Sequence, residues 1–217
     1  MESEKIINEI KSELNHKRIQ LLIKRFFDIV FSIFLLILLS PLFLILIIWI
    51  SIDSPGGAIF KQIRVGKDGE EFTIYKFRSM VKNADKMFNK EVNEDNKDTF
   101  VFQEKDDPRI TRSGKFLRKT SLDELPQLIN IIKGDMSLIG PRPEIQEIVK
   151  SYSDRDKIRL LMKPGVSGLA QVNGRGNLEL SETINYDIEY IEKFSLAMDF
   201  KIFFKTIKVV FTREGAY

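Results

Sequence analysis

Residues 118–128 read Arg-Lys-Thr-Ser-Leu-Asp-Glu-Leu-Pro-Gln-Leu, and an apolar run follows them. Ser121 and Glu124 stand three apart, the spacing at which a hydroxyl and a carboxylate can each accept a hydrogen bond from a free N–H group at a helix start. Pro126 fits the first turn of such a helix, where a missing N–H removes no intrahelical hydrogen bond. The pattern therefore predicts a helix that begins near Leu122.

Two adjacent carboxylates, Asp123 and Glu124, would lie at the positive end of this helix. The helix dipole and the upstream Arg118 and Lys119 would keep both carboxylates ionised at neutral pH. An ionised carboxylate can act as a nucleophile or bind a divalent cation. The structural alternative, which spacing alone favours, is that Glu124 completes a capping box and Asp123 is an ordinary acidic residue of the first turn.

Composition narrows the class of protein. The chain has 217 residues, 43% of them hydrophobic and 30% charged, which is enough for one domain with a hydrophobic core plus an appendage. It has no cysteine and one histidine, His16, in a polar segment, so disulfides, thiolate metal sites and a histidine-based triad are excluded. A formal net charge of +3 does not indicate a nucleic-acid partner.

An apolar segment dominates the N-terminal part of the chain, after an amphipathic lead-in helix expected within residues 1–23. Residues 26–52 are almost wholly apolar and exceed the ~20 residues with which a helix crosses a bilayer. Basic residues flank this segment on both sides, so both ends would prefer the cytoplasm. Ser40 and Pro41 interrupt it, which predicts a broken helix that enters one leaflet and returns, or else a kinked helix that spans the membrane.

A β-hairpin is predicted next, with strands at 59–65 and 71–77 around the turn Gly-Lys-Asp-Gly. Its second strand ends in alternating aromatic and basic residues. Lys76 or Arg78 could contact a phosphate there, although the pattern alone somewhat favours solvated charges on an edge strand. Residues 82–107 are rich in charged and amide side chains and are expected to form a surface excursion.

Three further segments contribute candidate features. Arg142 lies between two prolines, so little entropy is lost when its guanidinium binds a phosphate or a carboxylate. Two short helices are expected at 144–152 and 153–162. The glycine-rich residues 165–176 could bring backbone N–H groups close to a nucleotide, but they fit neither the P-loop nor the dinucleotide-binding pattern.

The last predicted helix, at residues 199–212, is amphipathic and follows another helix that starts at Ser181. Its aromatic and aliphatic residues fall on one face and its lysines on another, as is typical of a helix in a membrane interface. An ordinary core helix is the alternative. The apolar face consists of Phe200, Phe203, Phe204, Ile207 and Phe211, and the basic face of Lys201, Lys205 and Lys208.

Six motifs, in order along the chain, resemble those of the bacterial monotopic phosphoglycosyl transferases. The resemblance runs from about residue 24 to the C-terminus, and only residues 85–105 lack a matching motif. The motifs are Lys24-Arg25-Phe-Phe-Asp with the Ser40-Pro41 break, Tyr75-Lys-Phe-Arg-Ser-Met, Leu117-Arg-Lys-Thr-Ser-Leu-Asp-Glu-Leu-Pro-Gln-Leu, Lys133-Gly-Asp-Met-Ser-Leu-Ile-Gly-Pro-Arg-Pro, Pro164-Gly-Val-Ser-Gly-Leu-Ala-Gln-Val-Asn-Gly-Arg and Arg213-Glu-Gly-Ala-Tyr.

The resemblance implies a mostly helical α+β fold. The family is monotopic, with a re-entrant membrane helix, interfacial amphipathic helices and a small β-hairpin. Applied to this chain, this gives an amphipathic lead-in at 1–23, a re-entrant helix at 24–53 broken at Ser40-Pro41, and a catalytic domain at 54–217. That domain would lie on the cytoplasmic face of the bacterial inner membrane.

The resemblance also implies an activity and roles for named residues. The family transfers a sugar 1-phosphate from a UDP-sugar to undecaprenyl phosphate, a polyprenyl phosphate, and releases UMP, as the first membrane step of capsule or exopolysaccharide assembly. Asp123 would be the nucleophile that forms a covalent phosphosugar–aspartate intermediate, and Glu124 with Asp123 would hold Mg²⁺. The candidates for substrate binding are Lys76, Arg118 and Arg142 at the phosphates, and Asn173 and Arg175 at the nucleotide or sugar.

Two other functions remain compatible with these residues. A glycosyltransferase that moves only the sugar would release UDP and need no carboxylate nucleophile. A membrane-anchored scaffold would need neither nucleotide nor Mg²⁺. The sequence identifies neither the UDP-sugar nor the glycan, does not assign individual basic residues to individual phosphates, and does not decide whether the protein forms a homodimer.

Overall fold

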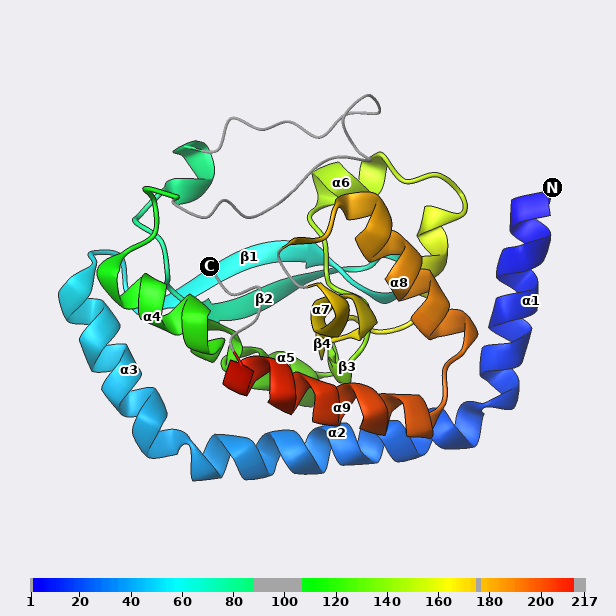
Figure 1. Cartoon of the computed structure of the whole chain (residues 1–217), viewed down its shortest axis with the longest axis horizontal. Coiled ribbons are helices and arrows are strands. Elements are labelled where there is room, and N and C mark those ends of the chain that lie inside the picture. Colours follow the sequence, from blue (N-terminus) through cyan, green and yellow to red (C-terminus); the bar gives the residue numbers. More distant parts are fainter. Residues whose placement is uncertain (1, 88–106, 175–176, 213–217) are drawn as a thin grey trace.

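In the computed structural model, which describes residues 2–87, 107–174 and 177–212, the chain is a mostly helical α+β domain with two small sheets (Figure 1). Three N-terminal helices, α1 (Glu2–His16), α2 (Arg18–Leu38) and α3 (Ser40–Asp53), frame the remaining elements along three sides. The predicted fold class is confirmed in its secondary structure. The lead-in helix α1 ends at His16, and the apolar helix α2 begins directly afterwards.

The break predicted at Ser40-Pro41 is present. Helices α2 and α3 meet at an angle of 64° around Leu39. Pro41 lies in the first turn of α3, where its missing N–H removes no helical hydrogen bond, and the Ser40 hydroxyl donates to the carbonyl of Ile37 at 2.8 Å. In the described part of the chain no single helix has the length and apolar character of a membrane span, whereas this bent pair meets both criteria when taken together.

A polar stripe on α2 attaches this helix to the rest of the domain. Lys24, Asp28 and Ser32, four residues apart, are all buried. Lys24 donates to the carbonyl of Ile139 and pairs with Asp199 at 2.6 Å, while Asp28 accepts hydrogen bonds from the backbone and side chain of the 137–138 segment. Lys24 belongs to the basic flank that was predicted to face the cytoplasm. Its ammonium group is instead buried and paired inside the protein.

The predicted hairpin is confirmed with its predicted bounds. Strands β1 (Ile59–Val65) and β2 (Glu71–Phe77) are antiparallel, and the turn between them contains the short 3-10 helix η1 (Lys67–Gly69). Asp68 and Gly69 have φ angles of 57° and 83°, which an aspartate and a glycine tolerate well. The buried Asn130 ties β2 to the helix behind it, because its amide bonds the backbone of Tyr75 and Thr73.

The helix predicted to begin near Leu122 is present only as two shorter elements, and the expected capping box is wrong. Helix α4 (Arg112–Thr120) ends at Ser121, which has a left-handed φ of 58°. A 3-10 turn, η4 (Leu122–Glu124), follows, and α5 (Gln127–Lys133) begins only after Pro126. Ser121 does not cap this turn, so the expected capping box is absent. In a helix starting at 122, Pro126 would occupy the fifth position, where an N–H is required.

The glycine-rich segment forms a strand that the sequence did not indicate. Strand β4 (Gly165–Ser167) pairs in parallel with β3 (Ser137–Ile139). A Cβ atom at Gly165 would lie 2.1 Å from the backbone nitrogen of Gly140, so glycine is needed for this close approach. At this position the glycine serves backbone packing.

The remaining elements close the domain. The two helices expected at 144–152 and 153–162 are shorter, as α6 (Gln146–Lys150) and a 3-10 helix η5 (Asp156–Leu161). The excursion expected at 82–107 begins with the short 3-10 helix η2 (Ala84–Met87), and most of the rest of it lies outside the described residues. The motif at 213–217 also lies outside them. The C-terminal part comprises α7 (Leu169–Asn173), α8 (Leu180–Glu192) and α9 (Leu196–Thr212).

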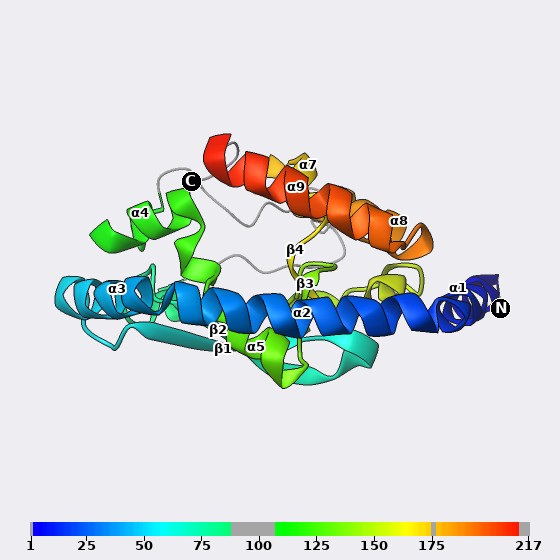
Figure 2. The ribbon, with the colours of Figure 1, turned by 90° about the horizontal axis from the view of Figure 1, so that it is seen from below.

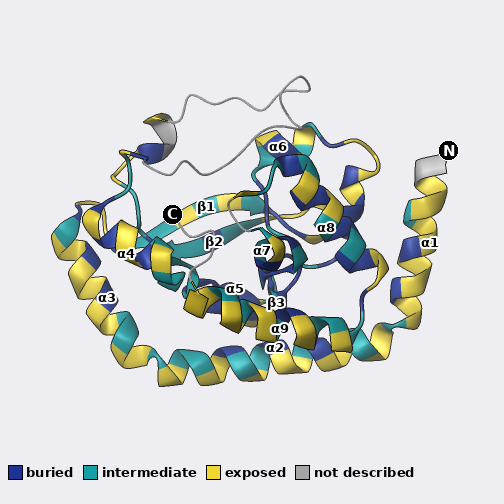
Figure 3. Ribbon diagram, viewed as in Figure 1, coloured by how far each residue is buried: buried dark blue, intermediate teal, exposed yellow. Residues whose placement is uncertain are grey.

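One side of the molecule exposes large apolar side chains. Seen from below, α2 and α3 run through the middle, with α4 and α9 on one side and α5 with the hairpin on the other (Figure 2). Exposed positions recur along α2, α3 and α9 (Figure 3). Ile37 is 70% exposed, Ile52 80% and Phe211 83%. Large exposed apolar side chains that recur on three helices are typical of an interaction surface.

The predicted apolar face of α9 is divided. Phe200, Phe204, Ile207 and Phe211 are exposed. Phe203 instead turns towards the domain and packs edge-on against Phe31 of α2, with ring centroids 5.5 Å apart. The prediction of a single face was therefore wrong for Phe203, because the helix has the protein on one side and an open surface on the other.

Candidate active site

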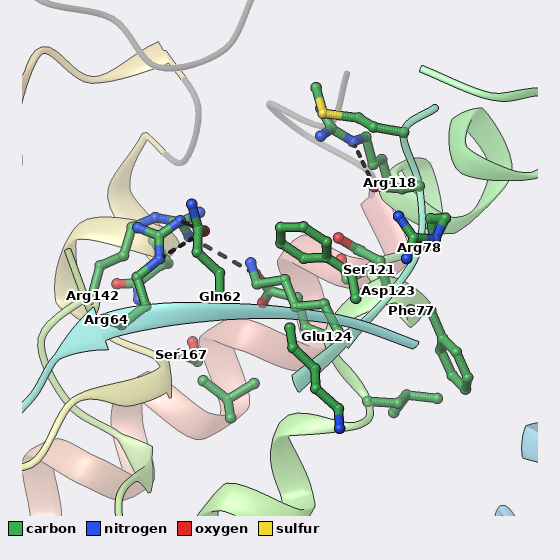
Figure 4. A pocket seen from close by; sticks show the side chains of 18 of the residues that line it. Gln62, Arg64, Phe77, Arg78, Arg118, Ser121, Asp123, Glu124, Arg142 and Ser167 are labelled. Carbon is green, nitrogen blue, oxygen red and sulfur yellow. Dashed lines mark hydrogen bonds and ion pairs between the residues drawn. The ribbon is translucent and has the colours of Figure 1, made fainter. Parts of the chain in front are cut away.

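A cleft of about 1420 Å³ gathers charged side chains from segments far apart in the sequence (Figure 4). Its walls come from α2, the β-hairpin, η4, β3 and the loop after it, β4, α7 and α9. Five of the seven predicted catalytic and substrate-binding residues line it, and these are Asp123, Glu124, Lys76, Arg118 and Arg142.

The two carboxylates reach the cleft because the chain turns sharply before them. The left-handed conformation of Ser121 ends α4, and the following 3-10 turn η4 carries Asp123 and Glu124. This turn packs against β2, whose residue Lys76 lines the same cleft. The dyad therefore lies between the end of helix α4 and strand β2.

Glu124 is the centre of a small charge cluster. Its Oε1 atom lies 3.1 Å from the Lys76 ammonium and 3.9 Å from the Arg142 guanidinium. Burial lowers the pKa of Lys76, and the attraction of Glu124 opposes that shift. The cluster places two cations beside a carboxylate at the wall of the cleft, where the phosphates of a substrate could replace part of the interaction.

Asp123 has a different environment from the one predicted. Burial, and next the negative charge of Glu124, raise the pKa of Asp123 to about 6, although Lys76 and Arg118 act in the opposite direction. The expected lowering by a helix dipole is therefore outweighed by desolvation. At pH 7 most of this carboxyl group is still ionised, and a half-buried, poorly solvated carboxylate is a better nucleophile than a fully hydrated one.

Arg118 is held by the segment that follows β2. Its Nε atom donates to the Ser79 hydroxyl at 3.1 Å, and its guanidinium acts electrostatically on Asp123. Helix α4 lies directly on the backbone here, because a Cβ atom at Gly114 would be 2.0 Å from the carbonyl oxygen of Ser79. Glycine at 114 is thus needed for the position from which Arg118 reaches the cleft.

Arg142 rests on a buried ionic cluster that the sequence analysis missed. Arg159 donates to the backbone carbonyl of Arg142 at 3.1 Å. It also forms an ion pair with Asp187 and lies 3.6 Å from Glu144. All three charged side chains are at most 3% exposed. The signal was present, because Arg159 is a charged residue within the apolar run Ile-Arg-Leu-Leu-Met.

Further polar residues of the cleft were also missed. Gln62 and Arg64 follow Phe60 at the two-residue spacing of one strand face, and Arg64 donates to the Gln62 side chain at 2.7 Å and to the Pro143 carbonyl at 3.2 Å. The side-chain amide of Gln171 has both polar atoms buried at the wall of the cleft, and among the described residues neither has a hydrogen-bond partner. This amide is suited to a polar ligand.

Asn173 is not brought to the dyad. It lies exposed at the end of α7, and its side chain accepts a hydrogen bond from Lys205 of α9 and donates to the Leu169 carbonyl. Arg175 lies outside the described residues. Their roles at the nucleotide or sugar stay predictions.

The donors around the dyad suit Mg²⁺ bound together with a substrate. Within the described ranges there is no group of three or more acidic, histidine or cysteine side chains that could hold a metal by itself. Mg²⁺, however, commonly takes one or two protein carboxylates and completes its shell with water and substrate phosphates. Asp123 and Glu124 are two such carboxylates in adjacent positions at the cleft.

Comparisons with known proteins show the family to which the chain belongs. A family model described as bacterial sugar transferase matches residues 19–213. The undecaprenyl-phosphate galactose phosphotransferase of Salmonella typhimurium is 46% identical over 209 residues, which cover 93% of this chain and 43% of that protein. The UDP-glucose:undecaprenyl-phosphate glucose-1-phosphate transferase of Escherichia coli is 38% identical over 90% of this chain and 42% of its own length.

A third relative is shorter. The exopolysaccharide production protein ExoY of Sinorhizobium fredii is 38% identical over 200 residues, which cover 89% of this chain and 88% of that protein. The chain thus spans less than half the length of the first two relatives and most of the third. From the extent of the family match and these identities, the chain belongs to the bacterial sugar transferase family.

Proposed function

We propose that the protein transfers a sugar 1-phosphate from a UDP-sugar to undecaprenyl phosphate and releases UMP. The observation that carries the proposal is the half-buried Asp123 carboxylate, which faces a cleft among Lys76, Arg118 and Arg142. A diphosphate substrate needs such cations, and an ionised carboxylate among them can attack the phosphorus or hold a metal. The names of the Salmonella and Escherichia relatives, which denote transfer of sugar phosphates to this lipid, support the same reaction.

The proposed mechanism has two displacements. In the first, an Asp123 oxygen attacks the phosphorus next to the sugar, the bond to the bridging oxygen breaks, and UMP leaves with both electrons of that bond. In the second, a phosphate oxygen of the lipid attacks the same phosphorus, Asp123 is released, and a polyprenyl diphosphate sugar results. Lys76, Arg118 and Arg142 balance charge on the non-bridging oxygens, which is the main way proteins accelerate phosphoryl transfer.

A divalent cation fits this scheme. Asp123 and Glu124 would hold Mg²⁺ together with the diphosphate of the substrate, and the cation would supply the neutralisation that an anionic nucleophile needs when it approaches a diphosphate. Residues of the chain itself position the cationic side chains of the site. Glu124 keeps Lys76 and Arg142 at the cleft wall, and Arg159 holds the Arg142 backbone.

Incubation of the protein with Mg²⁺, undecaprenyl phosphate and a panel of UDP-sugars tests the function. We expect UMP from one or a few of the sugars, a lipid product containing that sugar and its phosphate, and loss of both when a chelator removes the metal. Release of UDP would establish glycosyl transfer instead. No nucleotide from a broad panel, with folding confirmed by circular dichroism, would favour the scaffold.

The location that we propose is the cytoplasmic face of the bacterial inner membrane, with residues 24–53 as a re-entrant helix and 54–217 as the catalytic domain. The bend of 64° and the exposed apolar side chains of α2 and α3 support this topology. The outward aromatic residues of α9 would lie in the interface. A role in capsule or exopolysaccharide assembly is part of this proposal, and the exopolysaccharide production protein ExoY among the relatives supports it.

The topology can be tested in intact cells because the chain has no cysteine of its own. Cysteines introduced as Lys5→Cys and Glu70→Cys lie before and after the bent helix pair. A re-entrant helix keeps both on the same side, so we expect neither to react with a membrane-impermeant maleimide until the cells are opened. If one position reacted in intact cells and the other did not, the helix pair would cross the membrane.

A further inference from the structure

The cleft that holds the dyad has an apolar branch as well as a charged one. The cavity continues from Asp123 and Glu124 to carbon-rich side chains on α2, β3, β4 and α9. In Figure 2 strands β3 and β4 lie between α2 and α9, so the branch has two helical walls and a floor of strands. Its lining includes Phe31, Leu35, Leu138, Val166, Phe203 and Val209.

Helix α9 contributes to this branch with a face distinct from its outer one. Phe203, Thr206 and Val209 recur every three residues and line the cleft. Phe204 and Phe211 belong to the opposite face and are 65% and 83% exposed. Of the inner row, Phe203 packs edge-on against Phe31 of α2, while Thr206 and Val209 line the cleft. A bilayer surface could cover only the outer face.

The two hydroxyl groups of the branch are already engaged, and the buried amide of Gln171, which has no hydrogen-bond partner among the described residues, lies on α7. The hydroxyls of Ser167 and Thr206 lie 2.6 Å apart, and Thr206 also donates to the carbonyl of Ile202 at 2.8 Å. The wall therefore presents mainly carbon to a ligand. A uridine or a sugar would leave its own hydrogen-bonding groups unpaired here, whereas the opposite side of the cleft offers Gln62 and Arg64.

A hydrocarbon chain is the ligand that matches these walls. We propose that the α2–α9 branch binds the isoprenoid chain of the acceptor lipid and so leads its phosphate from the bilayer to Asp123. The proposal rests on the proposed function and adds a binding site for the acceptor to it. It also explains why apolar side chains of α2 continue from the exposed surface of the helix into the cleft, as Phe31 and Leu35 do.

Protection of a single cysteine tests the site without any catalysis. Val209→Cys places a thiol in the branch, and Lys208→Cys places the control thiol next to it on the exposed lysine face. The protein is held in neutral detergent without UDP-sugar, and alkylation by N-ethylmaleimide is timed. At undecaprenyl phosphate ten times above its dissociation constant, alkylation at 209 should slow about tenfold, since about one site in ten stays free. The control should not change.

Two comparators make the outcome specific. Neryl phosphate, with the same headgroup and two isoprene units, should protect position 209 less than undecaprenyl phosphate does, and a UDP-sugar alone should not protect it. Equal alkylation with and without undecaprenyl phosphate would overturn the proposal, and so would equal protection of both cysteines. If the proposed reaction failed but position 209 were protected, the protein would be a binder of isoprenoid phosphates, so the two failures are distinguishable.

A larger side chain in the branch gives a second readout. Val209→Trp should fill it and raise the KM for undecaprenyl phosphate much more than the KM for neryl phosphate. An equal rise for the two acceptors, or a rise for the UDP-sugar alone, would place the isoprenoid chain elsewhere.

Discussion

Asp123→Asn is expected to lower the rate of UMP release at least about 10³-fold, as replacement of a group that takes part in bond formation does in other covalent enzymes. The amide has nearly the shape of the carboxylate but lacks the anionic oxygen that attacks phosphorus. Initial rates of UMP release with the preferred UDP-sugar measure the effect. Intact-protein mass spectrometry should find the added mass of a sugar phosphate on the wild type after incubation without acceptor, and none on the variant.

The control for this experiment is Asp68→Asn. Asp68 is an exposed carboxylate in the hairpin turn with a left-handed φ of 57°, which asparagine adopts easily. The same chemical change there should leave the rate within about twofold, as is usual for surface substitutions. A rate for Asp123→Asn above roughly a tenth of the wild-type rate would contradict the nucleophile role and leave Asp123 as a metal or structural residue.

Arg159→Met is expected to lower the free energy of unfolding by about 3–5 kcal/mol, the usual cost of removing one partner from a buried ionic cluster. The variant leaves Asp187 and Glu144 buried without this cation, and the carbonyl of Arg142 loses its donor. Denaturant unfolding in detergent, followed by tryptophan fluorescence or circular dichroism, measures the loss.

Lys157→Met provides the matched control two residues away. Lys157 pairs with Asp154 at 2.8 Å, but both side chains are more than half exposed, so the loss should stay within about 1 kcal/mol. The double variant Arg159→Met, Asp187→Leu should recover part of the stability, since it removes a buried charge along with its partner. Equal losses for Arg159→Met and Lys157→Met would show that the cluster is not important for stability.

The elements that could be predicted from the sequence depend on local patterns. The hairpin bounds were correct because an alternating pattern and a glycine-containing turn specify strand length and register within a few residues. The break at Ser40-Pro41 was correct because proline acts through its own ring and missing N–H. In both cases the deciding interactions lie within a short stretch of chain.

The errors lie where distant segments decide the structure. Near Leu122 the spacing of Ser121 and Glu124 imitated a capping box, but Glu124 is held by Lys76, 48 residues away. Strand β4 forms because Gly165 meets the backbone of Gly140, which a single sequence does not reveal. Such contacts override local propensity.

The candidate site could be predicted in part for the same reason. Asp123, Glu124 and the three nearby cations were found from motifs, and the structure brings all five to one cleft. Arg159 was missed although it is a charged residue in an apolar run. Its link to the site is a hydrogen bond to the backbone carbonyl of Arg142, which the sequence alone does not reveal. Asn173 was proposed from the family motif; its side chain accepts a hydrogen bond from Lys205, and its role at the nucleotide or sugar stays a prediction.

In the topology proposed above, the polar stripe on α2 would determine the height of the active site above the lipid. Lys24 joins this helix to α9, and Asp28 joins it to β3, so the membrane arm and both walls of the acceptor branch behave as one rigid piece. A thicker or thinner bilayer would then raise, lower or tilt the whole domain, and the distance from Asp123 to the walls of the branch would stay the same. These contacts on α2 would therefore fix the depth in the bilayer at which a lipid phosphate reaches the active site.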